Sequence, residues 1–124
     1  MKKINKIILS EKFSQFSEHW SPKIIGELNG QQVRIAKLQG EFIWHSHALE
    51  DELFLVINGE LTIELKEQDN IVLREGEMVI IPKGIEHRPV AAAEVWLMLF
   101  EPASTINTGE INSERTISKP DYLF

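Results

Sequence analysis

Residues 40–59 read GEFIWHSHALEDELFLVING and residues 76–91 read GEMVIIPKGIEHRPVA, and these two stretches decide the fold. They contain three of the four histidines of the chain, His45, His47 and His87. A carboxylate, Glu52, follows the first pair. Three imidazoles and one carboxylate are a ligand set that suits a redox-capable or Lewis-acid metal ion.

The first histidine pair lies in a short aromatic segment, residues 42–47, which we predict to be a strand. Side chains on a strand alternate between its two faces, so His45 and His47 point the same way. By the same rule Phe42 and Trp44 point outward, away from the ligands. The pair therefore supplies two neighbouring nitrogen ligands.

The carboxylate ligand is expected from the strand that follows. Glu52 shares one face of that strand with Phe54 and Val56. Glu50 and Asp51 lie beside it and compete for the role. Strand parity and the fixed distance to the next glycine turn favour Glu52.

The third histidine arrives from the second stretch. Gly76 opens a strand, Pro82 ends it, and Gly84 allows a sharp reversal before the chain re-enters the sheet near His87. This arrangement delivers a fourth ligand from a distant strand to the same face.

The rest of the chain is predicted to be mostly strands. Asn29-Gly30 and Asn58-Gly59 are two-residue hairpin signals between apolar runs. About eight short strands separated by Gly, Pro or Asn turns indicate an all-β sandwich or barrel. The predicted strand segments are 23–28, 31–38, 42–47, 52–57, 60–66, 71–74, 77–81, 86–90 and 95–101.

The two quoted stretches resemble the two conserved motifs of the cupin superfamily. The first has Gly40, His45, His47, Glu52 and Gly59 at the motif positions, and the second has Gly76, Pro82, Gly84 and His87. The resemblance implies a double-stranded β-helix, or jelly-roll barrel, with a metal inside its mouth. It also implies His45, His47, Glu52 and His87 as ligands of Fe, Mn, Ni, Zn or Cu, and a homodimer.

We expect a single domain in three parts. Residues 1–32 form an N-terminal helix and strand that pack on the barrel, residues 33–101 form the cupin barrel, and residues 102–124 form a C-terminal tail. The helix is short: Ser10 is its expected cap, and Phe13 and Phe16 share one face. The tail is either loose or an ordered wrap.

The composition of the chain limits the classes of molecule that it is expected to bind. The net charge is −6, which disfavours nucleic acid, and the sequence contains no cysteine, which excludes disulfides and thiolate ligands. The apolar runs are too short for a signal peptide or a membrane span. We therefore expect a cytoplasmic protein whose partner is a small molecule.

Four side chains are predicted to line a pocket beside the metal: Phe54, Val56, Met98 and Phe100. Ordinary barrel core is the alternative for each of them.

Three functions remain open at this point. The first is a metalloenzyme of the dioxygenase, isomerase or cyclase type, for which the sequence names no acid or base. The second is a non-catalytic cupin that binds a sugar or carboxylate. The third is a structural role with the metal as a staple, which predicts a closed coordination sphere. Titratable groups beside the open metal position would favour the enzyme.

Overall fold

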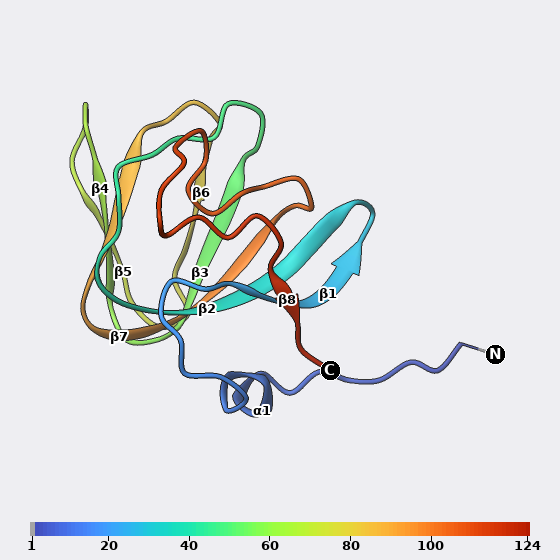
Figure 1. Ribbon diagram of the computed structural model, residues 1–124. Coiled ribbons are helices and arrows are strands. Elements are labelled where there is room, and N and C mark those ends of the chain that lie inside the picture. Colours follow the sequence, from blue (N-terminus) through green and yellow to red (C-terminus); the bar gives the residue numbers. More distant parts are fainter. Residues whose placement is uncertain (1) are drawn as a thin grey trace.

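The computed structural model describes residues 2–124 and contains one short helix and eight strands (Figure 1). The prediction of an all-β fold with a short N-terminal helix is confirmed. Among these residues no helix is long and apolar enough to cross a membrane. The elements are α1 (Leu9–Phe13), β1 (Lys23–Leu28), β2 (Gln31–Glu41), β3 (Glu52–Asn58), β4 (Leu61–Leu65), β5 (Ile71–Leu73), β6 (Met78–Ile81), β7 (His87–Pro102) and β8 (Asp121–Tyr122).

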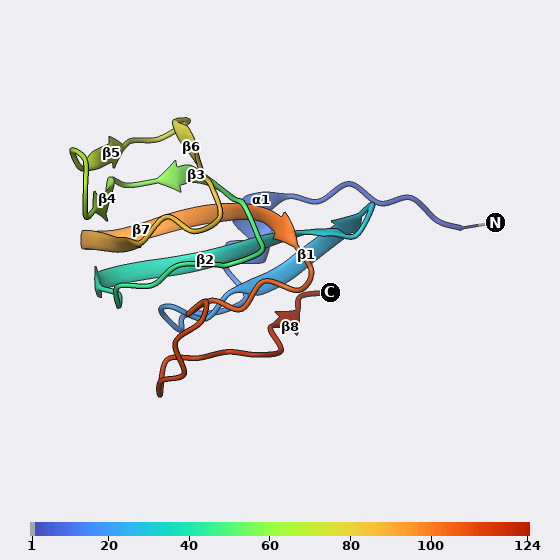
Figure 2. The same ribbon diagram turned by 90° about the horizontal axis from the view of Figure 1, so that it is seen from above.

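Strand β7 is the centre of the sheet. It pairs with β2 along most of its length on one side. On the other side it pairs with β4 through its first residues and with β3 through its last ones. The strand order is β5-β4-β7-β2-β1-β8, with β3 joined to β6 and β7, and the layers are visible edge-on in Figure 2. The strand pairing does not close into a ring, but the arrangement fits a cupin jelly roll.

The first predicted hairpin is confirmed in its details. β1 and β2 are antiparallel neighbours joined at Asn29-Gly30. Asn29 has φ 50° and Gly30 has φ 78°. Two successive residues with positive φ form the tight turn whose twist matches that of the flanking strands.

Two strand predictions were wrong. Residues 42–47 form no strand, because after β2 ends they bond to β7 at two separate points, Phe42 with Pro89 and the isolated bridge between His45 and His87. Residues 86–90 and 95–101 belong to one continuous strand, β7, because β2 supplies a partner along most of its length.

The apolar side chains form two clusters, one on each face of the β2–β7 pair. The inner cluster lies between the strands and includes Leu38, Phe54, Val56 and Leu97. The outer cluster is covered by the N-terminal segment. Its buried members are Phe13, Phe16 and Ile35, and Trp96 and Met98 pack against them.

The helix itself differs from the prediction at its start. Ile8, not Ser10, is at the cap position, and no side chain caps the helix. Phe13 and Phe16 are both buried in the outer cluster, as their predicted shared face requires. The helix is therefore held by packing rather than by its cap.

The C-terminal segment is an ordered wrap. Strand β8 of this segment pairs in parallel with β1. Thr108, which lies in the segment before β8, is fully buried. The backbone N–H of Glu110 donates to the carbonyl of Ser46, between the two histidines of the first motif, at 3.2 Å. The segment, red in Figure 1, therefore contacts the loop that carries two predicted ligands.

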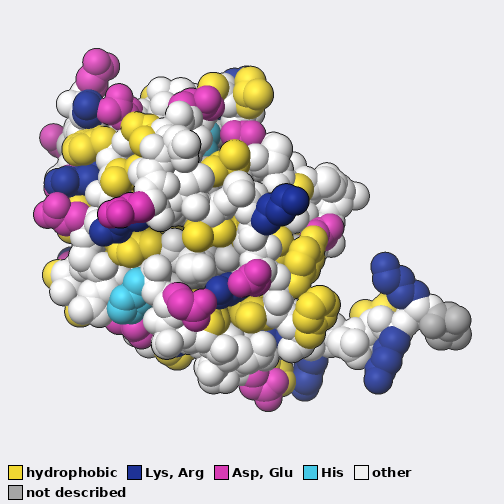
Figure 3. Space-filling view, in the orientation of Figure 1, with side chains coloured by type: hydrophobic (Ala, Val, Ile, Leu, Met, Phe, Trp, Pro, Cys, Tyr) yellow, Lys and Arg dark blue, Asp and Glu magenta, His cyan; other side chains and the backbone are white. Residues whose placement is uncertain are grey.

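Charged side chains of both signs are interspersed with hydrophobic ones over the face drawn in Figure 3. That face carries no continuous basic stripe of the kind that a nucleic-acid-binding surface has.

Candidate metal centre

The four predicted ligands lie together. His45, His47, Glu52 and His87 each offer a nitrogen or oxygen atom, and these atoms all lie within 4.8 Å of one another. All four side chains are buried. Two come from the loop after β2, one from the start of β3 and one from the start of β7. The fold brings the distant His87 to three residues that lie close together in the sequence.

Backbone hydrogen bonds hold the ligand loop against β7. His45 and His87 exchange both backbone hydrogen bonds, with N–O distances of 3.1 and 2.9 Å. The N–H of Gly84 donates to the carbonyl of His47 at 2.7 Å. Gly84 has φ 82°, so the reversal expected from its sequence position is present and serves this contact.

Two of the histidines are oriented by neighbouring carbonyls. Nδ1 of His45 lies 2.9 Å from the oxygen of Ile43, and Nδ1 of His87 lies 2.9 Å from the oxygen of Ile85. A ring N–H that donates in this way leaves the lone pair of Nε2 free for a metal. Both rings therefore point a ligand atom into the cluster.

The donor atoms in the cluster fit a metal ion. Nε2 of His47 and Nε2 of His87 lie 2.9 and 3.4 Å from Oε1 of Glu52. None of these three buried atoms has a partner in hydrogen-bonding geometry among residues 2–124. Ligands about 2.1 Å from one metal lie at most about 4.2 Å apart, so a spread of up to 4.8 Å needs only small side-chain movements.

The electrostatics keep Glu52 and His45 in the protonation states that bind a metal. Burial acts to raise the pKa of Glu52, but the neighbouring side chains of His47, His87 and Glu101 outweigh it and lower the pKa well below its usual range. Burial, followed by repulsion from His87, lowers the pKa of His45 to about 4. An ionised carboxylate and a neutral imidazole are the forms that bind metals.

The two competing carboxylates point elsewhere. Oε2 of Glu50 accepts a hydrogen bond from Ser104 Oγ at 2.9 Å. Oδ1 of Asp51 accepts one from the backbone N–H of Lys83 at 2.8 Å. Neither residue belongs to the cluster, which supports the choice of Glu52.

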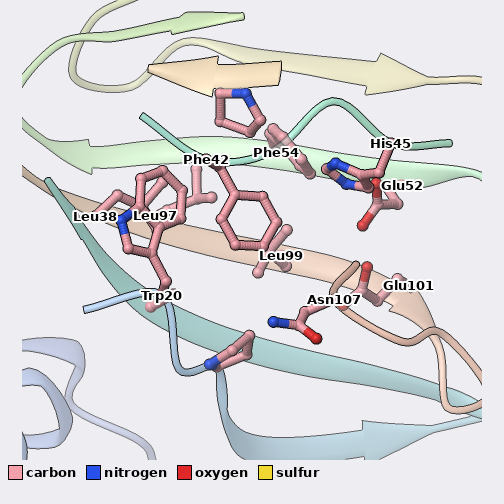
Figure 4. Close-up of a pocket in the computed structure, with 13 residues that line it drawn as sticks. Trp20, Leu38, Phe42, His45, Glu52, Phe54, Leu97, Leu99, Glu101 and Asn107 are labelled. Atoms are coloured by element: carbon pink, nitrogen blue, oxygen red, sulfur yellow. The ribbon is translucent and has the colours of Figure 1, made fainter. Parts of the chain in front are cut away.

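A cavity of about 50 Å³ adjoins the cluster (Figure 4). His45, Glu52 and Glu101 lie at one end of it, and the rest of its wall is mostly apolar. The lining residues are Trp20, Pro22, Ala36, Leu38, Phe42, His45, Glu52, Phe54, Pro89, Leu97, Leu99, Glu101 and Asn107.

Phe42 lies inside this cavity, which corrects the prediction that it points outward. Its ring meets that of His45 edge-on, with centroids 5.3 Å apart, and stacks on Trp20 at 4.7 Å. Strand alternation does not apply because residues 42–47 form no strand. Trp44 does lie away from the ligands, beside the side chains of Lys66 and Arg88.

The predicted pocket wall is partly wrong. Phe54 lines the cavity, and Val56 lies in the inner cluster without lining it. Met98 and Phe100 lie on the opposite face of β7, where Met98 packs on the outer cluster.

The wall is instead formed by Leu97, Leu99 and Glu101. Because β7 is unbroken, the face of His87 continues through the odd-numbered residues, which are the buried ones at both ends of the strand. Counting from His87 along one strand would have found them.

Glu101 is the titratable group that the sequence analysis missed. It is 2% exposed, and its Oε1 accepts a hydrogen bond from Nη1 of Arg34 at 3.1 Å. Burial and the Glu52 carboxylate raise the pKa of Glu101 well above its usual range, and Arg34 opposes them. A carboxyl group whose pKa is raised keeps its proton to higher pH than usual, which suits it to act as an acid or base.

The C-terminal segment completes the cavity and covers the ligand loop. Asn107 lines the cavity. Gly109 lies so close to the loop that a Cβ built on it would be 2.0 Å from the carbonyl oxygen of Ser46 and 3.5 Å from Nδ1 of His47. Arg115 lies 5.8 and 5.7 Å from the ring centroids of Trp20 and Phe42.

Comparison with known proteins identifies the family. The family model described as "Cupin domain" matches residues 32–100, more than half of the chain. The chain belongs to the cupin family. This cupin is also 41% identical over 80 residues to the uncharacterized protein YdbB of Bacillus subtilis, a match that spans 64% of this chain and 65% of that protein. It therefore spans slightly less than two thirds of that relative.

Solved structures show the same fold. A cupin-2 domain containing protein from Shewanella frigidimarina is 49% identical, with a TM-score of 0.75, and the match covers 77% of this cupin and 93% of that chain. A hydroquinone 1,2-dioxygenase from a Sphingomonas strain is 17% identical, with a TM-score of 0.72, over 82% of this cupin and 33% of that chain. The second likeness shows the fold alone.

Proposed function

We propose that this cupin is a metalloenzyme that acts on a small molecule held in the cavity beside its metal. The ligands are His45, His47, Glu52 and His87, and the reaction is of the dioxygenase, isomerase or cyclase type. The convergence of unpartnered, buried donor atoms within 4.8 Å carries the proposal. We also propose, from the sequence, that the protein works in the cytoplasm.

The donor set supports a divalent ion without selecting one, because Fe, Mn, Ni, Zn and Cu all accept imidazole and carboxylate ligands. When bound, such an ion acts as a Lewis acid or, if it is redox-active, activates oxygen. Held by these four residues, an octahedral ion would keep two positions for substrate or water, as the enzyme proposal requires. A tetrahedral ion would instead have the closed sphere of a structural staple.

Glu101 supports an enzyme rather than a binding protein. It is a buried carboxyl group on the cavity wall beside Glu52, and it is not one of the four clustered ligands. In this proposal Glu101 holds or moves a proton at Oε2, while Arg34 fixes its other oxygen. In the alternative, a non-catalytic cupin that binds a sugar or carboxylate, this carboxyl group would only hydrogen-bond the ligand.

Metal analysis of protein purified without added metal tests the proposal. We expect close to one equivalent in the native protein, and loss of most of it in His87→Ala and Glu52→Gln. The matched controls are His19→Ala, a half-exposed histidine paired with Glu94, and Glu101→Gln, a buried carboxyl group outside the ligand set. Both controls should keep their metal.

Unchanged occupancy in His87→Ala and Glu52→Gln would show that the ligand assignment is wrong. If the metal is iron, oxygen uptake with candidate small molecules tests the dioxygenase reaction. A zinc or nickel protein that takes up no oxygen would point to the isomerase or cyclase reaction.

A further inference from the structure

We infer that the cavity selects a small, uncharged molecule with an apolar body and a single hydroxyl-bearing end. This inference rests on the proposed function, because it names the class of molecule that would meet the metal. Three observations carry it: the apolar wall, the unpartnered Oε2 of Glu101 at the ligand end, and a cavity lining that contains no Lys or Arg among residues 2–124.

The wall is suited to an apolar body. Most of the lining side chains are hydrocarbon or aromatic and come from β2, β3 and β7 and from the loops around them, as Figure 4 shows. A sugar in this space would turn several hydroxyls toward side chains such as Leu38, Leu97 and Leu99. Buried hydroxyls without partners weaken binding, so the wall disfavours a polyol.

Asn107 is the polar lining residue at the edge of this wall, and its amide is already used. Its Nδ2 donates to the carbonyl of Arg115 at 2.8 Å, and its Oδ1 accepts from the N–H of Ile117 at 2.7 Å. Both bonds lie within the C-terminal segment. Asn107 therefore holds that segment in place and has little hydrogen-bonding capacity left for a ligand.

Glu101 provides the position for one polar group. Its Oε1 is held by Arg34, whereas its buried Oε2 has no hydrogen-bonding partner among residues 2–124. A buried polar atom of this kind needs a partner. A ligand hydroxyl both donates and accepts, so it satisfies Oε2 whether or not the carboxyl group carries a proton.

The described side chains around the cavity offer an anionic ligand no positive charge, and the carboxylates of Glu52 and Glu101 would offset the charge of a divalent ion bound beside them. Among the described residues no Lys or Arg lines the cavity, while Glu52 and Glu101 both do. Arg34 is close to Glu101, but its guanidinium already donates to Gln32, to Glu101 and to the carbonyls of Ala103 and Thr105. The protein thus supplies no free cation for a ligand carboxylate.

Calorimetric titration with three probes tests the inference. Phenol has an apolar body and one hydroxyl, benzoate adds a negative charge, and xylose is a polyol. We expect the native protein to bind phenol at least tenfold more tightly than benzoate or xylose.

Cavity-filling variants locate the binding. Ala36 lines the cavity and is buried, so Ala36→Leu should weaken phenol binding at least tenfold. The matched control is Ala93→Leu, the same substitution at an exposed position of β7, which should leave phenol binding unchanged. Leu38→Phe is a second filling variant, and thermal melting checks that each variant is folded.

Tighter binding of benzoate or xylose than of phenol would overturn the inference. So would full phenol affinity in a folded Ala36→Leu or Leu38→Phe. The metal content of the same samples separates this result from the proposed function. If the native protein contains metal but binds xylose more tightly than phenol, only the inferred ligand class is wrong. If the native protein binds phenol but contains no metal, only the proposed metal centre is wrong.

Discussion

Arg34 and Glu101 form an ion pair inside the protein, with Nη1 3.1 Å from Oε1 and the two side chains 1% and 3% exposed. Glu101 lines the cavity, and Arg34 also donates to the carbonyls of Ala103 and Thr105. One guanidinium therefore fixes the cavity carboxyl group and the start of the C-terminal wrap.

Replacing Arg34 should be costly. Arg34→Leu leaves a buried carboxyl group and two carbonyls without their donor, and breaking a buried pair in this way costs about 3–5 kcal/mol. We expect a loss of that size in the free energy of unfolding measured with urea.

The control for this prediction is an exposed ion pair. Arg74 lies 3.1 Å from Glu60, with both side chains more than half exposed. Arg74→Leu should change the free energy of unfolding by no more than about 1 kcal/mol. Equal losses of unfolding free energy in the two variants would show that the buried ion pair stabilises the protein no more than the exposed one.

The metal-free protein should become less stable as the pH falls, in part through His45. Burial lowers the pKa of His45 to about 4 in the folded protein, from the ordinary value of 6.5. Between pH 6.5 and pH 4 the unfolded chain binds a proton at His45 more tightly than the folded protein does. The free energy of unfolding is therefore unaffected by this proton above pH 6.5 and decreases as the pH falls to 4.

Comparison with His45→Gln isolates this contribution. Gln does not titrate, so the stability difference between native and variant metal-free protein should shift against the native protein from pH 7 to pH 4. Urea unfolding at several pH values measures it. A difference that is the same at every pH would contradict the lowered pKa.

Gly109 should tolerate no side chain. Its φ of 61° already strains an alanine, and the added Cβ would also lie 2.0 Å from the carbonyl oxygen of Ser46. We expect Gly109→Ala to displace the wrap from the ligand loop and to destabilise the protein by more than about 2 kcal/mol. Faster hydrogen exchange at the amide of Glu110 should accompany the change.

Gly30→Ala is the matched control for this variant. Gly30 also has a positive φ, 78°, but a Cβ there would meet nothing within 4 Å. Its substitution measures backbone strain alone. If Gly109→Ala lowers the free energy of unfolding no more than Gly30→Ala does, the C-terminal segment can move away from the ligand loop at little cost.

The predicted homodimer has a candidate surface. Met78 and Ile80 on β6 are 51% and 55% exposed. They pair with Leu55 and Leu53 of β3, which in turn pair with residues of β7 that face away from the cavity. This apolar outer face, rather than the pocket, is where Phe100 lies. We expect a second copy to cover it.

Light scattering at micromolar concentration checks the dimer. The native protein should have twice the mass of the chain, and the double variant Met78→Lys, Ile80→Lys should be monomeric and folded. Val72→Lys, at an exposed position of β5, should remain a dimer. A monomeric native protein would contradict the prediction.

The sequence by itself determined which four side chains form the candidate metal cluster and which turns deliver them. The ligand types, the spacing of His45, His47 and Glu52, and the Pro82 and Gly84 reversal before His87 are local properties of the chain. So is the Asn29-Gly30 turn, because its positive φ angles depend on the residues that adopt them. These features could be predicted before any long-range contact was known.

Only the tertiary structure decided which side chains surround those ligands. Phe42 turns inward because residues 42–47 bond to β7 only at separate points and form no regular strand that would impose alternation. Strand β7 faces Glu101 rather than Phe100 inward because it continues unbroken from His87. The partnership of Arg34 with Glu101 joins residues 67 positions apart. Strand register and chain closure create these contacts, and both depend on pairing between distant segments that no local pattern encodes.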